Sequence, residues 1–178
     1  MGLVVFFRAA NVGGHQTFRP GGLVRQLASF GAVNVGAAGT LYAARADDPA
    51  ALERAIRRSV PFEPELMIRP SDEVVRLVDT APFGARPSPA GVERYATVLA
   101  ELPHPRPTLP VEEPPGTRWQ LRVVRIVGPF ALSVRRPAAG RPLYPNPVIE
   151  RRLGVRATTR TWATIEKLVA IVRGADSV

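Results

Sequence analysis

Two short polar stretches, one near each end of the chain, hold the residue types best suited to bind an anion. In the first, Asn11, Gly13 and Gly14 follow an apolar run over 3–7. Glycine tolerates positive φ and leaves backbone N–H groups bare, so such a turn can cradle an anion. A tight turn that simply requires glycine explains the same residues. The stretch is not a P-loop, because no Lys-Ser or Lys-Thr pair follows it.

The second stretch contains Arg160, Trp162 and Lys167, the only lysine of the chain. Arg160 has the planar fork that pairs with a carboxylate or a phosphate, and Trp162 has a ring that can stack on a base. Structural roles are the alternatives. Trp162 shares a helical face with Ile165 and Val169, which predicts a core position, whereas Lys167 falls on the opposite, solvent-facing side. For Arg160 the alternative is a buried ion pair.

Candidates for catalysis are few. The chain has no cysteine, which excludes disulfides, thiolate metal sites and cysteine nucleophiles. Its histidines are His15, beside the glycine turn, and His104, between two prolines in an expected loop. His15 is the one candidate general base. Without an acidic cluster or a Gly-x-Ser-x-Gly motif, these residues predict neither a metal site nor a serine nucleophile. We expect no metal and no cofactor, and an enzyme is the less favoured interpretation.

The chain is strongly basic, with 24 basic and 15 acidic residues and a net charge of +9. This balance favours a nucleic acid or another polyanion as partner. Arginines spread over a solvated surface are the alternative, because no run of basic residues exceeds two. The apolar run over 3–7 is too short for a signal peptide or a membrane span. We therefore expect a cytoplasmic protein without a membrane partner; the sequence does not indicate an oligomeric state.

The periodicity of apolar residues predicts an α+β fold in which one order of elements occurs twice. The first half reads β-α-β-β-α-β-α, with strands at 3–7, 32–35, 40–44 and 65–69. The second half reads β-loop-β-β-α-β-α, with strands at 95–99, 119–124, 130–135 and 157–161. Residues 103–116 hold six prolines, so we expect a surface loop in place of the first helix.

Two β-α-β-β-α-β units, each followed by a helix, predict tandem ferredoxin-like subdomains, the second of which lacks its first helix. The expected boundaries are 1–83 for the first subdomain, 84–92 for a connection, and 93–178 for the second with the C-terminal helix. Helix starts are expected at Asp48-Pro49 and Asn146-Pro147, where an N-cap residue precedes proline.

With these residues in place, the chain resembles the bacterial domain of unknown function 1697 family. The likeness rests on Arg8–Gly14 near the N-terminus, on Leu153-Gly154, on Ala157–Thr164, and on Lys167-Leu168. Members typically carry Leu-Arg-Gly-Ile-Asn-Val-Gly-Gly and Ala-Thr-Thr-Arg-Asn-Trp-Asn-Thr at the matching places. The resemblance implies tandem ferredoxin-like folds and leaves the activity open.

The sequence departs from the family pattern at polar positions. A Gln-Ser-Gly-Asn tetrad of the family is matched here by Ala37–Thr40, and Ala9 stands where the family has glycine. Thr161 and Ala163 replace the two asparagines that flank Trp162. If the polar groups of the family form a ligand site, this chain has weakened or altered that site.

Three functions compete on this evidence. The favoured one is a non-catalytic anion-binding or nucleic-acid-binding module, supported by the net charge and by a topology that RNA-recognition sheets also use. The second is an enzyme or binder of a small anionic ligand in a cleft between the subdomains. The third is a partner-binding or structural module without chemistry. No segment matches the aromatic signature of RNA-recognition sheets, which counts against the first.

Overall fold

The computed structural model describes residues 2–8, 20–84, 88–138, 140 and 142–176. The chain divides into two compact units, here called the first unit (Met1–Asp79 with Thr164–Val178) and the second unit (Thr80–Ala163). Most of the C-terminal helix groups with the first unit in this division. The subdomain boundaries expected from the sequence stay a prediction.

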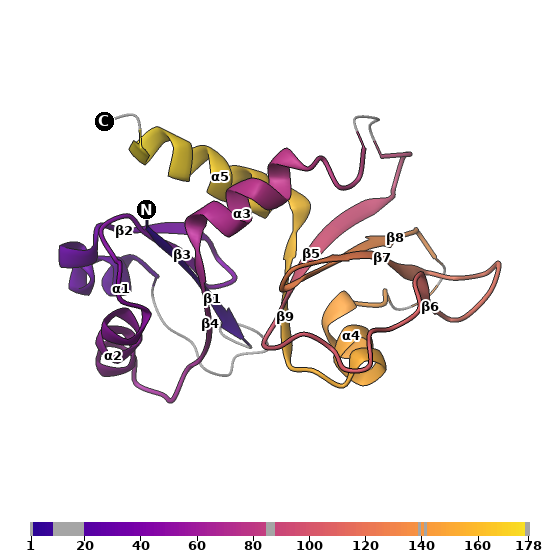
Figure 1. Cartoon of the computed structure of the whole chain (residues 1–178), viewed down its shortest axis with the longest axis horizontal. Helices are drawn as coiled ribbons and strands as arrows, with labels where there is room; N and C mark the ends of the chain where they lie inside the picture. Colours follow the sequence, from indigo (N-terminus) through magenta and orange to yellow (C-terminus); the bar gives the residue numbers. More distant parts are fainter. Residues whose placement is uncertain (1, 9–19, 85–87, 139, 141, 177–178) are drawn as a thin grey trace. The chain divides into compact units, whose positions relative to one another are not determined.

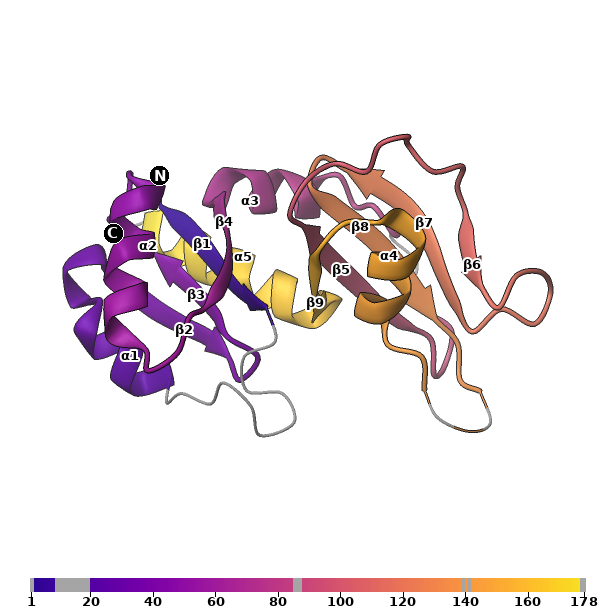
Figure 2. The same cartoon turned by 90° about the horizontal axis from the view of Figure 1, so that it is seen from below.

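The first unit contains a four-stranded antiparallel sheet with helices on both faces (Figures 1 and 2). The strands lie in the order β2-β3-β1-β4. On one face lie α1 and α2, and on the other lie α3 and α5. The bounds are β1 Leu3–Arg8, α1 Pro20–Gln26, β2 Ala32–Gly36, β3 Thr40–Ala43, α2 Pro49–Ser59, β4 Glu65–Pro70, α3 Ser71–Asp79 and α5 Trp162–Asp176, with a 3₁₀ turn at Ala28–Phe30.

Strand β1 runs through the middle of this sheet and is buried on both sides, as its continuous apolar sequence predicts. Leu3 and Val5 pack with Leu52 of α2 in one core cluster. Helix α2 begins where the sequence predicts, because the Asp48 side chain accepts a hydrogen bond from the Ala50 N–H at 2.8 Å.

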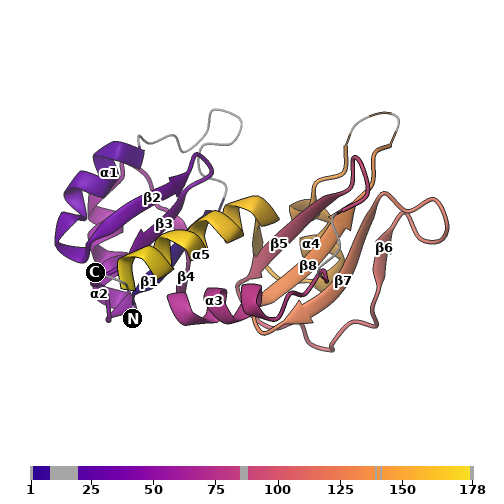
Figure 3. The ribbon, with the colours of Figure 1, turned by 90° about the horizontal axis from the view of Figure 1, so that it is seen from above.

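The second unit contains a five-stranded antiparallel sheet in the order β6-β7-β8-β5-β9. One face is covered by α4, whose Ile149 and Leu153 pack against Leu99, Val123 and Ala131. Figure 3 looks onto the opposite face, where β5, β8 and β7 lie in front of α4. Helix α4 is the one helix that lies wholly within the described part of this unit. The bounds are β5 Glu93–Leu99, β6 Val111–Glu113, β7 Leu121–Val127, β8 Phe130–Arg135, α4 Pro145–Leu153 and β9 Ala157–Thr161.

The predicted α+β class is confirmed as two antiparallel sheets with five α-helices among the described residues. Two local predictions were wrong. The expected loop over 103–116 contains β6, which pairs with β7 through Val111 and Val123. Helix α4 begins at Pro145, so Asn146 lies inside its first turn, where its Oδ1 accepts a hydrogen bond from the Thr159 hydroxyl at 3.2 Å.

No helix among the described residues is long and apolar enough to cross a membrane.

Candidate functional site

The positive charge of the chain is concentrated in one of the two units. The second unit holds thirteen arginines and five glutamates, a balance of +8. The first unit holds eleven basic and ten acidic residues, a balance of +1. The net charge of +9 is therefore a local property of residues 80–163 and not a general feature of the surface.

The strand register places several of these arginines on the sheet face turned away from α4. In β5, β8 and β7, Arg94 lies opposite Val134, and Val134 lies opposite Arg122. Two strand spacings separate Arg94 from Arg122, which corresponds to about 10 Å between their Cα atoms. Arg136 extends the same face by one residue, because its N–H donates to the Gln120 carbonyl at 2.8 Å. We call Arg94, Arg122, Arg125 and Arg136 the arginine face.

A β-bulge adds Arg125 to this face. The register of β7 with β8 shifts between Val123 and Arg125, and Arg125 then lies opposite Leu132. Without the bulge, strict alternation would put Arg125 on the side of Val123, which packs toward α4. Bulges commonly re-aim a side chain beside a functional site. Arg125 is exposed, and its side chain makes no ion pair or hydrogen bond with the described residues.

Trp119 holds two of the arginines in place. The Arg136 Cζ lies over its ring, 3.5 Å from the ring centroid, and the Arg122 Cζ also lies over the ring, at 4.2 Å. Trp119 is only 8% exposed, and both arginine side chains are half-buried, so these cation–π contacts are partly shielded from water. Arg122 also pairs with Glu112 of β6 at 2.5 Å. The pKa of Glu112 is lowered by a hydrogen bond from the Gly116 N–H and by Arg122.

The other edge of the face carries a second aromatic group. Phe83 and Trp162 meet edge to face, with ring centroids 5.0 Å apart, and the Arg94 Cζ lies 5.3 Å from the Phe83 centroid. Trp162 is 9% exposed, and Phe83 is half-buried. The two tryptophans of the chain therefore support arginines and the core, and their faces are not open platforms for stacking a base.

Arg160 occupies a buried position on β9, beside Ala96 of β5. Its Nη1 donates to the Thr158 hydroxyl and to the Thr159 carbonyl, each at 2.9 Å. Burial lowers the pKa of Arg160 to about 10, which still leaves the guanidinium charged at neutral pH.

The remaining predicted site residues lie elsewhere. Asn11, Gly13 and Gly14 are outside the described residues. Lys167 is exposed on α5 and belongs to the first unit. Of the residues singled out in the sequence, only Arg160 and Trp162 lie in the second unit beside that face. The described residues hold no cluster of three or more His, Cys, Asp or Glu side chains arranged to bind a metal ion.

Sequence reasoning missed Arg94, Arg122, Arg125 and Arg136. A charge count by halves would have shown the surplus in the second half, because such asymmetry is visible without a structure. The bulge that turns Arg125 has no comparable signal in the sequence.

Comparison with known families decides where this chain belongs. Residues 1–126 match the model of a family described as Protein of unknown function (DUF1697). The chain is a member of DUF1697. The match ends inside β7, so it includes Arg94, Arg122 and Arg125, while Arg160 and Trp162 lie beyond it. No curated protein and no solved structure matches the chain.

Proposed function

We propose that this DUF1697 protein binds single-stranded nucleic acid, without catalysis, on the arginine face of its second unit. The observation that carries the proposal is the coincidence of three features in residues 80–163: the charge of +8, a register that gathers four arginines on the sheet face turned away from α4, and the exposure of Arg125 on that face. Electrostatic attraction to phosphates supplies most of the affinity in such complexes.

The mode of contact follows from what is exposed. Trp119 and Trp162 are buried, so base stacking contributes little, and the arginines contact the phosphate backbone. Phosphate contacts carry no sequence information, and the binding should therefore be largely independent of sequence. A flexible single strand can bring its phosphates to arginines that lie on different strands of one sheet.

We also infer that both units are ferredoxin-like. The order β2-β3-β1-β4 of the first sheet has a counterpart in β7-β8-β5-β9 of the second, with β6 added outside β7. In each, a helix (α2 or α4) connects the third strand of the set to the fourth. These correspondences support a repeated unit in which a proline-rich loop with β6 replaces one helix.

The test is fluorescence anisotropy with labelled 20-nucleotide single-stranded RNA and DNA, and with the matching duplex, at 0.1 M salt. The double variant Arg94→Gln/Arg125→Gln should lose roughly 25-fold in affinity for single strands, about fivefold for each contact. The matched control is Arg25→Gln/Arg58→Gln, which removes the same charge from exposed side chains of the first unit that have no partner among the described residues. The control should change affinity less than about twofold.

Absence of binding by the unmodified protein in 20 mM salt would overturn the proposal. So would an equal loss in the two double variants, because binding would then follow total charge and not the arginine face.

A further inference from the structure

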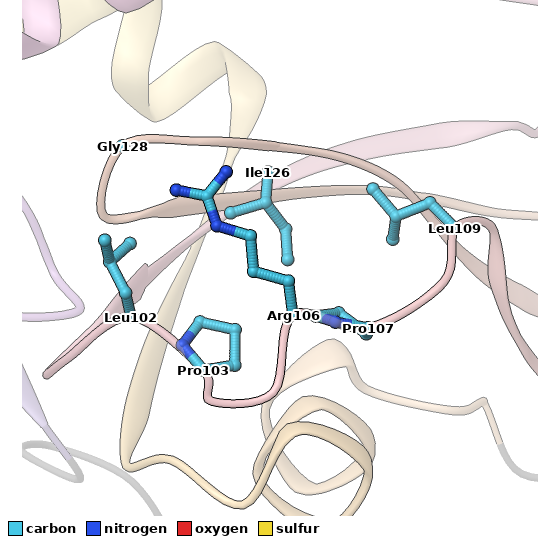
Figure 4. Close-up of a pocket in the computed structure, with 7 residues that line it drawn as sticks. All are labelled: Leu102, Pro103, Arg106, Pro107, Leu109, Ile126 and Gly128. Carbon is cyan, nitrogen blue, oxygen red and sulfur yellow. The ribbon is translucent and has the colours of Figure 1, made fainter.

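A small apolar pocket lies at the opposite end of β7 from Trp119, between the proline-rich loop and the turn that joins β7 to β8 (Figure 4). Its volume is about 170 Å³. The walls are formed by Leu102, Pro103, Leu109 and Ile126. Leu102 is 51% exposed and Leu109 is 36% exposed, so two large apolar side chains border the pocket without being buried by the fold.

One charged side chain, Arg106, lines this pocket. In Figure 4 its aliphatic stem runs beside Ile126, and its guanidinium group extends toward the turn at Gly128. Within the described part of the chain, Arg106 makes no hydrogen bond or ion pair. No described acidic side chain lines the pocket. The pocket therefore combines an apolar interior with one guanidinium group that has all its donors free.

We propose that this pocket binds a small monocarboxylate whose apolar body is an aromatic ring or a branched aliphatic chain. An apolar cavity of roughly 150 Å³ holds one benzene molecule, so the volume here suits an apolar group of about six heavy atoms. A guanidinium fork matches a carboxylate through two parallel hydrogen bonds, which selects the head group. The apolar body would contact Leu109 and Ile126, and the carboxylate would receive hydrogen bonds from Arg106.

This site is separate from the arginine face, and the inference does not depend on nucleic-acid binding. Arg125 and Ile126 are consecutive in β7 and therefore project from opposite faces of the sheet. Ile126 packs with the cluster on the α4 side, whereas Arg125 lies opposite Leu132 on the other side. A ligand held against Ile126 does not compete for Arg125.

The experiment compares benzoate with benzamide, a neutral molecule of nearly the same shape, by isothermal titration calorimetry and by amide chemical shifts of the full chain. Benzoate should bind about tenfold more tightly than benzamide, because only its head group forms a charged pair with Arg106. Arg106→Gln should remove that tenfold preference and leave the affinity for benzamide unchanged. Arg118→Gln, a matched loss of an exposed arginine in the same unit, should leave the preference intact.

Further measurements test the apolar interior of the pocket and the position of the bound ligand. Acetate carries the same head group without the apolar body and should bind at least tenfold more weakly than benzoate. Leu109→Ala removes a partly exposed side chain of the pocket wall and should weaken benzoate and benzamide equally. The amide signals of Leu109, Ile126 and Gly128 should shift on titration. Equal affinity for benzoate and benzamide, equal affinity for acetate, or shifts confined to the arginine face would each overturn the proposal.

Discussion

The substitution Arg125→Gln should weaken single-strand binding about fivefold at 0.1 M monovalent salt. Each phosphate contact to a single strand contributes about 0.7 to the slope of log affinity against log salt. At 0.1 M, which is tenfold below the 1 M reference, one contact is then worth about 10 to the power 0.7, or roughly 1 kcal/mol. Arg125 is exposed and has no partner among the described residues, so its loss should leave the free energy of unfolding within about 0.5 kcal/mol.

The loss of affinity caused by Arg125→Gln should become smaller as the salt concentration rises. At 0.5 M the contribution of one contact falls to about 1.6-fold, so the variant and the unmodified protein should converge as salt rises. With four arginines on the face, the unmodified protein should show a slope near −2.8 and the variant a slope near −2.1, if each contributes about 0.7. Anisotropy titrations at five salt concentrations between 0.05 and about 0.5 M resolve a difference of this size.

Arg152→Gln is the matched control for this measurement. Arg152 lies on α4, which covers the other face of the same sheet, and its removal changes the charge of the unit equally. The Debye length at 0.1 M is about 10 Å, so a charge on the far side of the sheet is largely screened. A fivefold loss that stays constant from 0.05 to about 0.5 M would refute the reasoning, because a phosphate contact must weaken with salt.

Three further predictions concern the fold that supports the site. Trp119→Ala should lower the free energy of unfolding in urea by about 3–5 kcal/mol. Trp119→Phe should lower it by less than about 2 kcal/mol, because this variant keeps an aromatic ring beside the two guanidinium groups and removes an indole N–H that has no hydrogen-bond partner among the described residues. Equal losses for the two variants would mean that the ring contacts contribute nothing. Gly39→Ala should lower the free energy of unfolding by about 2–4 kcal/mol, because φ is +69° there and a Cβ would lie 2.8 Å from the Phe7 Cβ. Gly36→Ala, which places its Cβ in open space, should leave the free energy of unfolding nearly unchanged in the same assay. Burial raises the pKa of Tyr95 to about 12, and a hydrogen bond to the Glu93 carboxylate adds to this shift. The folded state therefore keeps a proton that the unfolded state loses above pH ~10, so the free energy of unfolding, measured in urea, should decline between pH ~10 and ~12. The free energy of unfolding of Tyr95→Phe should decline less over the same range.

Much of the fold could be predicted because local signals and tertiary packing agree. The cap at Asp48 and the continuous apolar run of β1 are strong signals, and both elements form where they predict. Strand β6 carried no such signal, since it has only three residues and lies between Pro110 and Pro114. Its existence depends on pairing with β7, which is a tertiary contact. Helix α4 begins at Pro145 and not at Pro147, because the first turn of a helix accepts proline at more than one position.

The candidate site was harder to predict than the fold, and the reason is geometric. The sequence drew attention to unusual residues, Arg160 and Trp162, and the structure buries both. The four residues of the arginine face are ordinary in sequence, and only strand register brings them together; Arg125 is exposed and the other three are half-buried. Register depends on the bulge at Val123 and Arg125, and a shift of one residue exchanges the two faces of a strand. Prediction from motifs therefore selects residues that are unusual in sequence and misses residues that strand register brings together.

The contrast between the two units gives the proposed function its strongest physical argument. Both sheets are antiparallel, and their corresponding strands follow the same order. In the first unit helices cover both faces, and the charge is close to balanced at +1. In the second unit one face carries α4, the other carries the arginine face, and the charge is +8. A general preference for arginine would raise the charge of both units alike, and self-repulsion among thirteen arginines destabilises the unit that holds them. A concentration of like charge in one unit therefore costs stability, and the proposed binding of a polyanion would offset this cost.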